Sequence, residues 1–167
     1  GSKGIIRKNL ISLNKKPLLY YSISNSKKAN VDEVWISTDD KEMKEVSLKY
    51  GAEVIDRPAE ISKDTSKCEE ALIHFAANVD FDILVFIQNT SPLVRPEDIN
   101  EGIAKVKSGE YDSMFSAYLE HWTPRWTTDI KPIDWDPSTR PRRQEKEEVY
   151  VENGAFYITT REKLLSS

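Results

Sequence analysis

The chain of 167 residues contains a single cysteine, Cys68, and only two histidines. One thiol excludes an intrachain disulfide bond and also excludes a metal cage built from several thiolates. A protein with so little cysteine fits a reducing compartment, so we expect a cytoplasmic location, or a nuclear one if the host is a eukaryote.

Long apolar runs and excess positive charge are also missing. No stretch approaches the roughly 20 apolar residues that cross a bilayer, and no secretory signal pattern opens the chain, so no membrane partner is expected. Lys and Arg total 24 against 28 Asp and Glu, which leaves a net charge of −4. This balance argues against a nucleic-acid polymer as partner, and any anionic ligand must meet a local cluster of basic residues.

The residues that are present predict one globular α/β domain, because 38% of them are hydrophobic and helical and strand-like patterns alternate. Between residues 31 and 56 a strand, a helix and a strand follow one another, which predicts a βαβ unit and a partly parallel sheet. Thr38-Asp39-Asp40 supplies the cap of that helix. Asp39 could instead be a metal ligand at the end of the strand, but capping is the favoured role. We expect helices over 17–30, 41–50, 64–78, 96–109 and 161–165, and strands over 31–37, 52–56, 83–87, 112–118, 149–151 and 154–159.

The stretch Asp82–Pro92 organises the chain. Ile83 to Ile87 is an unbroken apolar run, which is typical of a strand covered on both faces in the middle of a parallel sheet. The run stops at Gln88-Asn89-Thr90-Ser91, and ligands of open α/β sheets bind at the carboxyl ends of strands. These amides and hydroxyls suit a small ligand with many hydroxyl groups, although an ordinary polar turn has the same composition.

The N-terminal residues have the composition of a phosphate cradle. Gly1-Ser2-Lys3-Gly4 offers flexible backbone and a cation, and Arg7, Lys8 and Asn9 follow closely. Such cradles normally follow a strand, and here none precedes the motif. The tetrapeptide is therefore either the scar of an expression tag or the start of a fragment whose first strand is missing, and the basic cluster is either a phosphate contact or a solvated loop.

The character of the chain changes over residues 120–148. Trp122, Trp126 and Trp135 lie among four prolines, which indicates an excursion that acts as a lid or an oligomer surface, or a long loop packed on its own domain. Arg140-Pro141-Arg142-Arg143-Gln144 is the densest positive patch. It suits a carboxylate or phosphate ligand, a nuclear-localisation signal, or pairing with the acidic residues 145–148.

Taken in order, five segments of the chain resemble the acylneuraminate cytidylyltransferases, also called CMP-sialic acid synthetases, over nearly its whole length. The family includes enzymes for legionaminate and pseudaminate, and the CMP-Kdo synthetases are more distant. The segments are Gly1–Ile5 with Lys8-Asn9, Trp35–Asp39, Arg57–Glu60, Gln88–Pro92, and Arg140–Gln144 with Glu152–Tyr157.

The resemblance implies a Rossmann-like, three-layer α/β/α fold with a mostly parallel mixed sheet, and a homodimer. It implies transfer of CMP from CTP to a nine-carbon 2-keto sugar acid such as N-acetylneuraminate, with release of pyrophosphate and a need for Mg²⁺. By the same resemblance, Ser2, Lys3, Lys8, Asn9 and Arg57 lie on the nucleotide side. The sugar-acid side takes Gln88, Thr90, Ser91, Arg140, Arg142, Arg143 and Asn153, and the residues expected to matter for catalysis are Lys8 and Arg143.

Two departures from the family limit what is expected. The family's first strand, ending in an Ala-Arg-Gly-Gly type of sequence, would precede Gly1, and its Asp-Ile-Asp segment with magnesium ligands would follow Ser167. No metal ligand or general base can therefore be named, and 167 residues alone are expected to catalyse poorly. The alternatives are a nucleotidyltransferase for another sugar acid such as Kdo, or a non-catalytic fragment or dimerisation module. Central to the enzyme hypothesis is that the glycine-lysine turn and the arginine cluster meet at one rim of the sheet.

Overall fold

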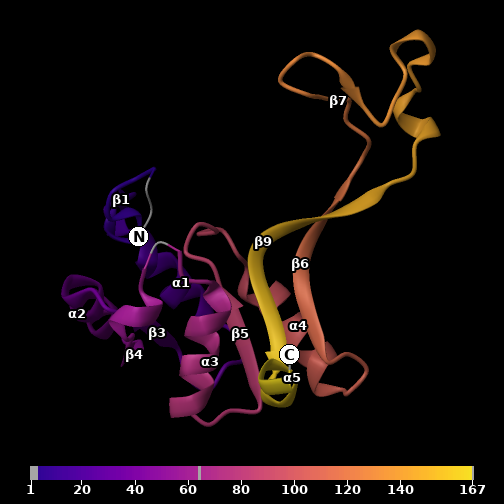
Figure 1. Ribbon diagram of the computed structural model, residues 1–167. Helices are drawn as coiled ribbons and strands as arrows, with labels where there is room; N and C mark the ends of the chain where they lie inside the picture. The colour runs from indigo at the N-terminus through magenta and orange to yellow at the C-terminus, as the bar shows by residue number, and fades with distance from the viewer. Residues whose placement is uncertain (1–3, 64, 167) are drawn as a thin grey trace. The chain divides into compact units, whose positions relative to one another are not determined.

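The structure is a computed structural model that describes residues 4–63 and 65–166 (Figure 1). The chain divides into two compact units. Unit 1 comprises residues 1–115 and 155–167, and unit 2 comprises residues 116–154.

Helices and strands are mixed along the chain. The α-helices are α1 (Leu18–Ser26), α2 (Lys41–Lys49), α3 (Cys68–Asn78), α4 (Pro96–Lys107) and α5 (Arg161–Ser166). The strands are β1 (Ser12–Leu13), β2 (Lys16–Pro17), β3 (Trp35–Thr38), β4 (Glu53–Asp56), β5 (Ile83–Ile87), β6 (Ser113–Glu120), β7 (Arg125–Trp126), β8 (Pro132–Ile133) and β9 (Val149–Thr160). Four 3₁₀ turns complete the structure: η1 (Lys8–Leu10), η2 (Ala59–Ile61), η3 (Pro137–Thr139) and η4 (Arg143–Glu145). Within the described ranges, no helix combines the length and the apolar character that crossing a membrane requires.

The βαβ prediction is confirmed, since β3 and β4 pair in parallel on either side of α2, from Trp35 opposite Glu53 to Thr38 opposite Asp56. The prediction that Thr38-Asp39-Asp40 caps this helix is confirmed, but the capping residue is Asp40 and not Asp39. Asp40 is the N-cap of α2, and its carboxylate accepts a hydrogen bond of 2.9 Å from the Met43 backbone N–H. An N-cap side chain must reach the N–H three residues ahead, and only Asp40 precedes the helix at that spacing.

The prediction that β5 lies among parallel strands is wrong for the one neighbour that the structure describes. The strand has the expected bounds, but its partner is β9, which runs antiparallel to it from Ile83 opposite Thr160 to Ile87 opposite Phe156. β9 is also one strand of 12 residues rather than the two short strands predicted. An apolar run shows that a strand is covered on both faces, but it carries no information about the direction of the strand beside it.

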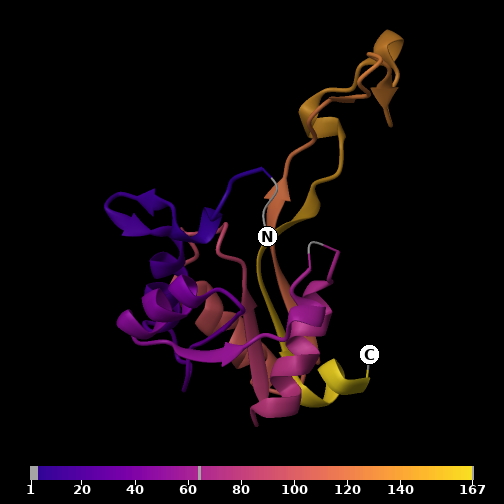
Figure 2. The same cartoon turned by 60° about the vertical axis from the view of Figure 1, so that its left-hand side comes forward.

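Unit 1 contains two clusters of buried apolar residues. One surrounds α4 and the β5–β9 pair, and its buried members are Ala29, Ile99, Val106, Phe156 and Ile158. The other surrounds α1 and the β3–β4 pair, and its buried members are Leu19, Ile23 and Ala52. α4 packs on β5 (Figure 1), and α3 lies beside α5 (Figure 2).

Among the described residues, one edge of β5 has no strand paired with it. Gln88 N–H donates to Ala155 C=O and Arg161 N–H donates to Asp82 C=O, so the even-numbered residues of β5 bond to β9. The backbone groups of Ile83, Val85 and Ile87 therefore point the other way, where no described strand pairs with them.

We expect Asp40→Ala to lower the free energy of unfolding by about 1 kcal/mol, because the substitution removes the cap of α2. The pKa of Asp40 is lowered chiefly by the Met43 N–H and also by Arg7. The difference between wild type and variant should therefore be largest above the ordinary value of 3.8 and fade as the pH falls through the lowered value. Urea denaturation measures it. Asp39→Ala is the matched control and should change stability by under about 0.5 kcal/mol.

Candidate functional site

The first candidate region is the N-terminal segment around Lys8. The predicted contacts Ser2 and Lys3 lie outside the described residues. Lys8 and Asn9 form η1 and are half-buried. Arg7, immediately before them, adopts a left-handed backbone conformation with φ of 54°.

Arg7 ties this segment to the start of α2. Its guanidinium lies 3.3 Å from the Asp40 carboxylate and 2.6 Å from Glu42. Asp40 follows the end of β3 by two residues, so the segment carrying Lys8 is held at the carboxyl end of that strand. Among the described residues no carboxylate forms an ion pair with Lys8, whose ammonium group remains available for an anion.

Arg57 lies at the same end of the β3–β4 pair. It follows β4 directly, and its Nε donates a hydrogen bond of 3.1 Å to Ser37 Oγ while a terminal nitrogen donates to the Ser37 carbonyl. Arg57 therefore joins the ends of the two strands. Arg7 and Arg57 together bring the two segments predicted for the nucleotide side to one end of this strand pair.

Gln88, Thr90 and Ser91 form the turn that follows β5. Gln88 N–H is bonded to Ala155 C=O, and Ser91 N–H donates to Gln88 C=O over 3.1 Å. The Asn25 amide of α1 donates to the Pro92 carbonyl over 3.1 Å, which fixes the far side of the turn. The predicted polar cluster thus stands at the carboxyl end of its strand, as the sequence pattern indicates.

The predicted arginine cluster, Arg140, Arg142 and Arg143, is not a uniform patch. The Arg140 guanidinium lies over the Trp135 ring, 5.7 Å from its centroid. The backbone N–H of Arg142 donates to Glu145, whose carboxylate also lies 3.8 Å from Arg142 Nε. Within the described part of the chain, no carboxylate pairs with Arg143, which lines a pocket instead.

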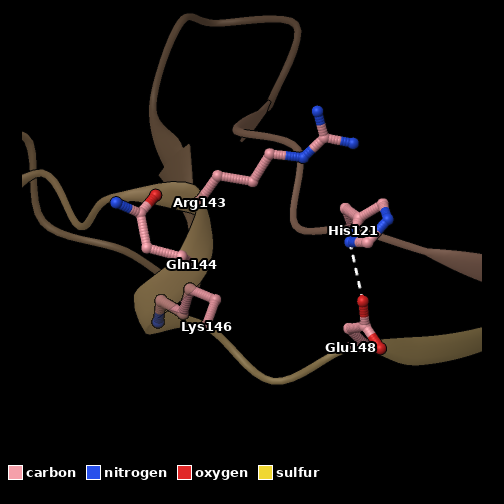
Figure 3. Close-up of a pocket in the computed structure, with 5 residues that line it drawn as sticks. All are labelled: His121, Arg143, Gln144, Lys146 and Glu148. Atoms are coloured by element: carbon pink, nitrogen blue, oxygen red, sulfur yellow. Dashed lines mark ion pairs between the residues drawn. The ribbon is translucent and has the colours of Figure 1, made fainter.

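The pocket in unit 2 has a volume of about 530 Å³ and is lined by His121, Arg143, Gln144, Lys146 and Glu148 (Figure 3). The Arg143 side chain extends toward the His121 ring, whereas the Gln144 amide and the Lys146 ammonium point the other way. His121 Nδ1 lies 2.8 Å from Glu148 Oε1. Two cations and one carboxylate give the pocket a net positive charge even with the imidazole neutral, which suits a small anion.

Sequence reasoning missed His121, Lys146 and Glu148. A signal existed for His121, because it directly precedes the tryptophan-rich stretch and is one of only two histidines. No comparable signal marked Glu148, which is the last residue in the mixed run of charges at 145–148. Only the pairing of strand ends brings it to His121.

The predicted sugar contact Asn153 lies in β9. Its side-chain oxygen accepts a hydrogen bond of 2.6 Å from Ser116 Oγ in β6. This bond and the His121–Glu148 pair fit one antiparallel register of β6 and β9. From Ser116 to His121 the chain advances by five residues, and the partner moves back by five, from Asn153 to Glu148. The pocket therefore opens beside the ends of this two-stranded ladder.

The three tryptophans of unit 2 support the segment that carries the arginines. Trp135 meets Trp126 edge-on at 4.8 Å and Trp122 at 6.0 Å between ring centroids. The Trp135 indole N–H also donates to the Arg125 carbonyl over 3.1 Å. The clusters of buried apolar residues among the described residues lie in unit 1. In unit 2 the packing of these rings helps to hold the backbone that leads to Arg143.

The described residues include no group of three or more His, Cys, Asp or Glu placed to hold a metal ion.

Comparison with known proteins gives a consistent result. The model of the protein family described as cytidylyltransferase matches residues 1–166. The chain is 34% identical to N-acylneuraminate cytidylyltransferase A of Danio rerio and 35% identical to N-acylneuraminate cytidylyltransferase of Oncorhynchus mykiss, over 97% and 96% of its length. It spans only about 40% of those relatives. It is 31% identical to a pseudaminic acid cytidylyltransferase of Campylobacter jejuni, over 96% of this chain and 74% of the relative.

Solved structures share the fold. The CMP:2-keto-3-deoxy-manno-octonic acid synthetase, solved in complex with CTP, superposes with a TM-score of 0.76 at 19% identity, over 99% of this chain and 72% of that one. The 4-diphosphocytidyl-2C-methyl-D-erythritol synthase of Anaerococcus prevotii gives 0.65 at 14% identity, over 97% and 70%.

We expect Trp135→Ala to destabilise unit 2 by about 2 kcal/mol or more, since the change removes two ring contacts, an indole hydrogen bond and the surface under Arg140. The loss should appear as weaker near-ultraviolet circular dichroism and faster proteolysis within residues 116–154. Trp135→Phe, which keeps an aromatic ring, should lose less. Equal protease resistance of the alanine variant and wild type would show that the cluster does not support this unit.

Proposed function

Because the chain belongs to the cytidylyltransferase family, we propose that it forms the CMP-transferring part of an enzyme that activates a nine-carbon 2-keto sugar acid with CTP. The observation that carries the proposal is the similarity of nearly the whole chain to N-acylneuraminate cytidylyltransferases of two fish. The pseudaminic acid enzyme among the relatives supports a sialic-acid-like acceptor in general rather than one particular acid. The products are the CMP-sugar and pyrophosphate.

In this reaction the anomeric hydroxyl of the sugar acid attacks the α-phosphorus of CTP, and the bond to the departing pyrophosphate breaks. The protein's task is to position the two reactants and to balance negative charge. The proposed architecture is a Rossmann-like three-layer α/β/α domain, which the fold similarity to a CTP-bound synthetase supports.

The nucleotide side of the site is proposed to include Lys8, Asn9 and Arg57, with Ser2 and Lys3 nearby. The contacts of Arg7 and Arg57 support this, because they hold both segments at the carboxyl end of the β3–β4 pair. Lys8 has no ion-pair partner among the described residues, so it would meet the triphosphate, whereas the Arg57 guanidinium is engaged by Ser37 and would act mainly by fixing the strand ends.

The residues proposed for the sugar acid are taken unit by unit: in unit 2, Arg143 for a carboxylate and Asn153 for a hydroxyl group, and in unit 1, Gln88, Thr90 and Ser91 for hydroxyl groups. Guanidinium groups bind carboxylates bidentately, and Arg143 is the arginine of its cluster that lines a pocket. Arg140 and Arg142 would support the site indirectly, since the Arg140 guanidinium lies over the Trp135 ring and the Arg142 Nε lies 3.8 Å from the Glu145 carboxylate.

Mg²⁺ is proposed as the metal that accompanies CTP. Mg²⁺ is commonly held by nucleotide phosphates, waters and only one or two carboxylates, so a dedicated cage of protein ligands is not required. Bound to the triphosphate, it would neutralise charge on the leaving pyrophosphate.

We further propose a homodimer in the cytoplasm. Large apolar side chains of unit 2 are exposed in the single chain, with Ile130 and Tyr150 each 79% accessible, and a second copy would cover such a surface. The single cysteine supports a reducing compartment.

The reaction class is tested by measuring pyrophosphate release from each of CTP, ATP, GTP and UTP in the presence of N-acetylneuraminate, pseudaminate or Kdo. We expect release with CTP and a nine-carbon acid, and its loss when EDTA removes Mg²⁺. Preference for Kdo would point to the alternative acceptor. Pyrophosphate release from another nucleotide would contradict cytidylyl transfer.

Lys8→Ala should weaken CTP binding about tenfold, because a charge-assisted contact with phosphate is lost. Isothermal titration calorimetry with CTP measures this even where turnover is slow. Lys107→Ala, an exposed lysine at the end of α4, is the control and should bind CTP as wild type does. Unchanged affinity in the Lys8 variant would remove this residue from the nucleotide site.

Arg143→Gln should weaken binding of the sugar acid about tenfold or more, whereas Arg142→Gln should change it less than about threefold, because the Arg142 guanidinium already lies beside the Glu145 carboxylate. Calorimetric titration with N-acetylneuraminate distinguishes the two arginines. Equal losses in both variants would mean that the cluster acts as a diffuse charge rather than through Arg143.

A further inference from the structure

The His121–Glu148 pair lines the pocket in unit 2 and brings an imidazole beside the Arg143 side chain. His121 follows the last residue of β6, and Glu148 precedes the first residue of β9. The pair therefore sits where the two strands end, and each side chain is about half exposed, at 52% and 51%. Protons can reach the imidazole from solvent without any opening of the structure.

The pair also decides which nitrogen of the ring faces a ligand. Nδ1 lies 2.8 Å from Glu148 Oε1, so it carries the proton that it donates to the carboxylate. Nε2 is then bare in the neutral ring and accepts hydrogen bonds, whereas in the protonated ring it becomes a donor. Glu148 thus holds the ring in place while the other nitrogen changes character with pH.

The charges around His121 favour an anion. Arg143 and Lys146 contribute two positive charges to the pocket and Glu148 contributes one negative charge. Glu120, the neighbour of His121, is engaged by Arg125 at 2.6 Å. The lining residues therefore sum to +1 with a neutral imidazole and to +2 with a protonated one.

We propose that His121, oriented by Glu148, is a proton-dependent contact for the carboxylate that Arg143 binds. The acid binds more tightly as the pH falls, since the protonated ring adds a donor and a positive charge beside the guanidinium. A carboxylic acid stays ionised between about pH 8 and 5, so a change of its affinity over that range arises in the protein. Glu148 is the positioning residue of the pair. The inference rests on the proposed function in taking a sugar acid as the ligand.

A simpler interpretation of the pair is a surface ion pair that only joins two strand ends. Such pairs contribute about 0–1 kcal/mol to stability and have no effect on a ligand. The two interpretations differ in one measurable respect, because only a ligand contact makes the affinity for a carboxylate depend on the protonation of His121.

The test is calorimetric titration of the 167-residue chain with N-acetylneuraminate at pH 5.5, 6.5 and 8.0. Wild type should bind about tenfold more tightly at pH 5.5 than at pH 8.0. His121→Gln should keep nearly the wild-type affinity of pH 8.0 at all three values. Glu148→Gln should bind more tightly than wild type at pH 8.0, because the pocket loses its negative charge.

The second histidine provides a matched control. His74 lies in α3 of unit 1, so His74→Gln should keep the wild-type pH dependence. This variant also leaves His121 as the only imidazole in the proton NMR spectrum, where its resonance should move on addition of ligand. Thermal unfolding of each variant checks that its fold is intact.

Titration with pyruvate, a simple 2-keto acid, separates this inference from the proposed substrate. Suppose that pyruvate moves the His121 resonance with the expected pH dependence but N-acetylneuraminate does not bind. The affinity of the pocket for carboxylates then depends on pH as inferred, and the proposed substrate is incorrect. If N-acetylneuraminate binds with a pH dependence that survives His121→Gln, the substrate stands and the role of His121 is overturned. Binding of neither acid overturns both.

Discussion

The antiparallel pairing of β5 with β9 is the interaction on which unit 1 depends. It joins segments about 70 residues apart and buries Phe156 and Ile158 against α4. Gly102 of α4 permits this contact, because a Cβ there would stand 2.5 Å from the Ile158 side chain. The ladder continues to Gln88, whose N–H bonds Ala155, so the same pairing fixes the start of the polar turn proposed to face the sugar.

The basic residues divide into those that hold the structure and those left for a ligand. Arg7, Arg57, Arg140 and Arg142 are engaged respectively by carboxylates, a serine, a tryptophan and a glutamate. Lys8, which follows Arg7, and Arg143, which follows Arg142, have no such partner among the described residues. Neighbouring charges of the same sign thus serve different purposes, which composition alone does not reveal.

Much of the local structure was predictable. The strand β5, the βαβ unit around α2 and the buried stripe of α4 follow from hydrophobic periodicity, which reports how a segment meets its surroundings. The segment Thr38-Asp39-Asp40 predicts the cap of α2 but does not single out Asp40, because two adjacent aspartates satisfy the same pattern and only backbone geometry selects one of them. The prediction of a parallel neighbour for β5 is wrong, because a run of apolar residues is equally suited to a parallel or an antiparallel neighbouring strand.

The amino-acid order by itself determined the family resemblance, the alternation of helices and strands, and the cationic and polar segments proposed to bind ligands. These depend on residue type and spacing, which are local properties of a chain. Tertiary structure alone decided that Arg143 rather than Arg142 lines a pocket, and that His121 meets Glu148 there. Those outcomes depend on which strand ends pair and on which partners come within reach, and such distances arise only when residues far apart in sequence are brought together.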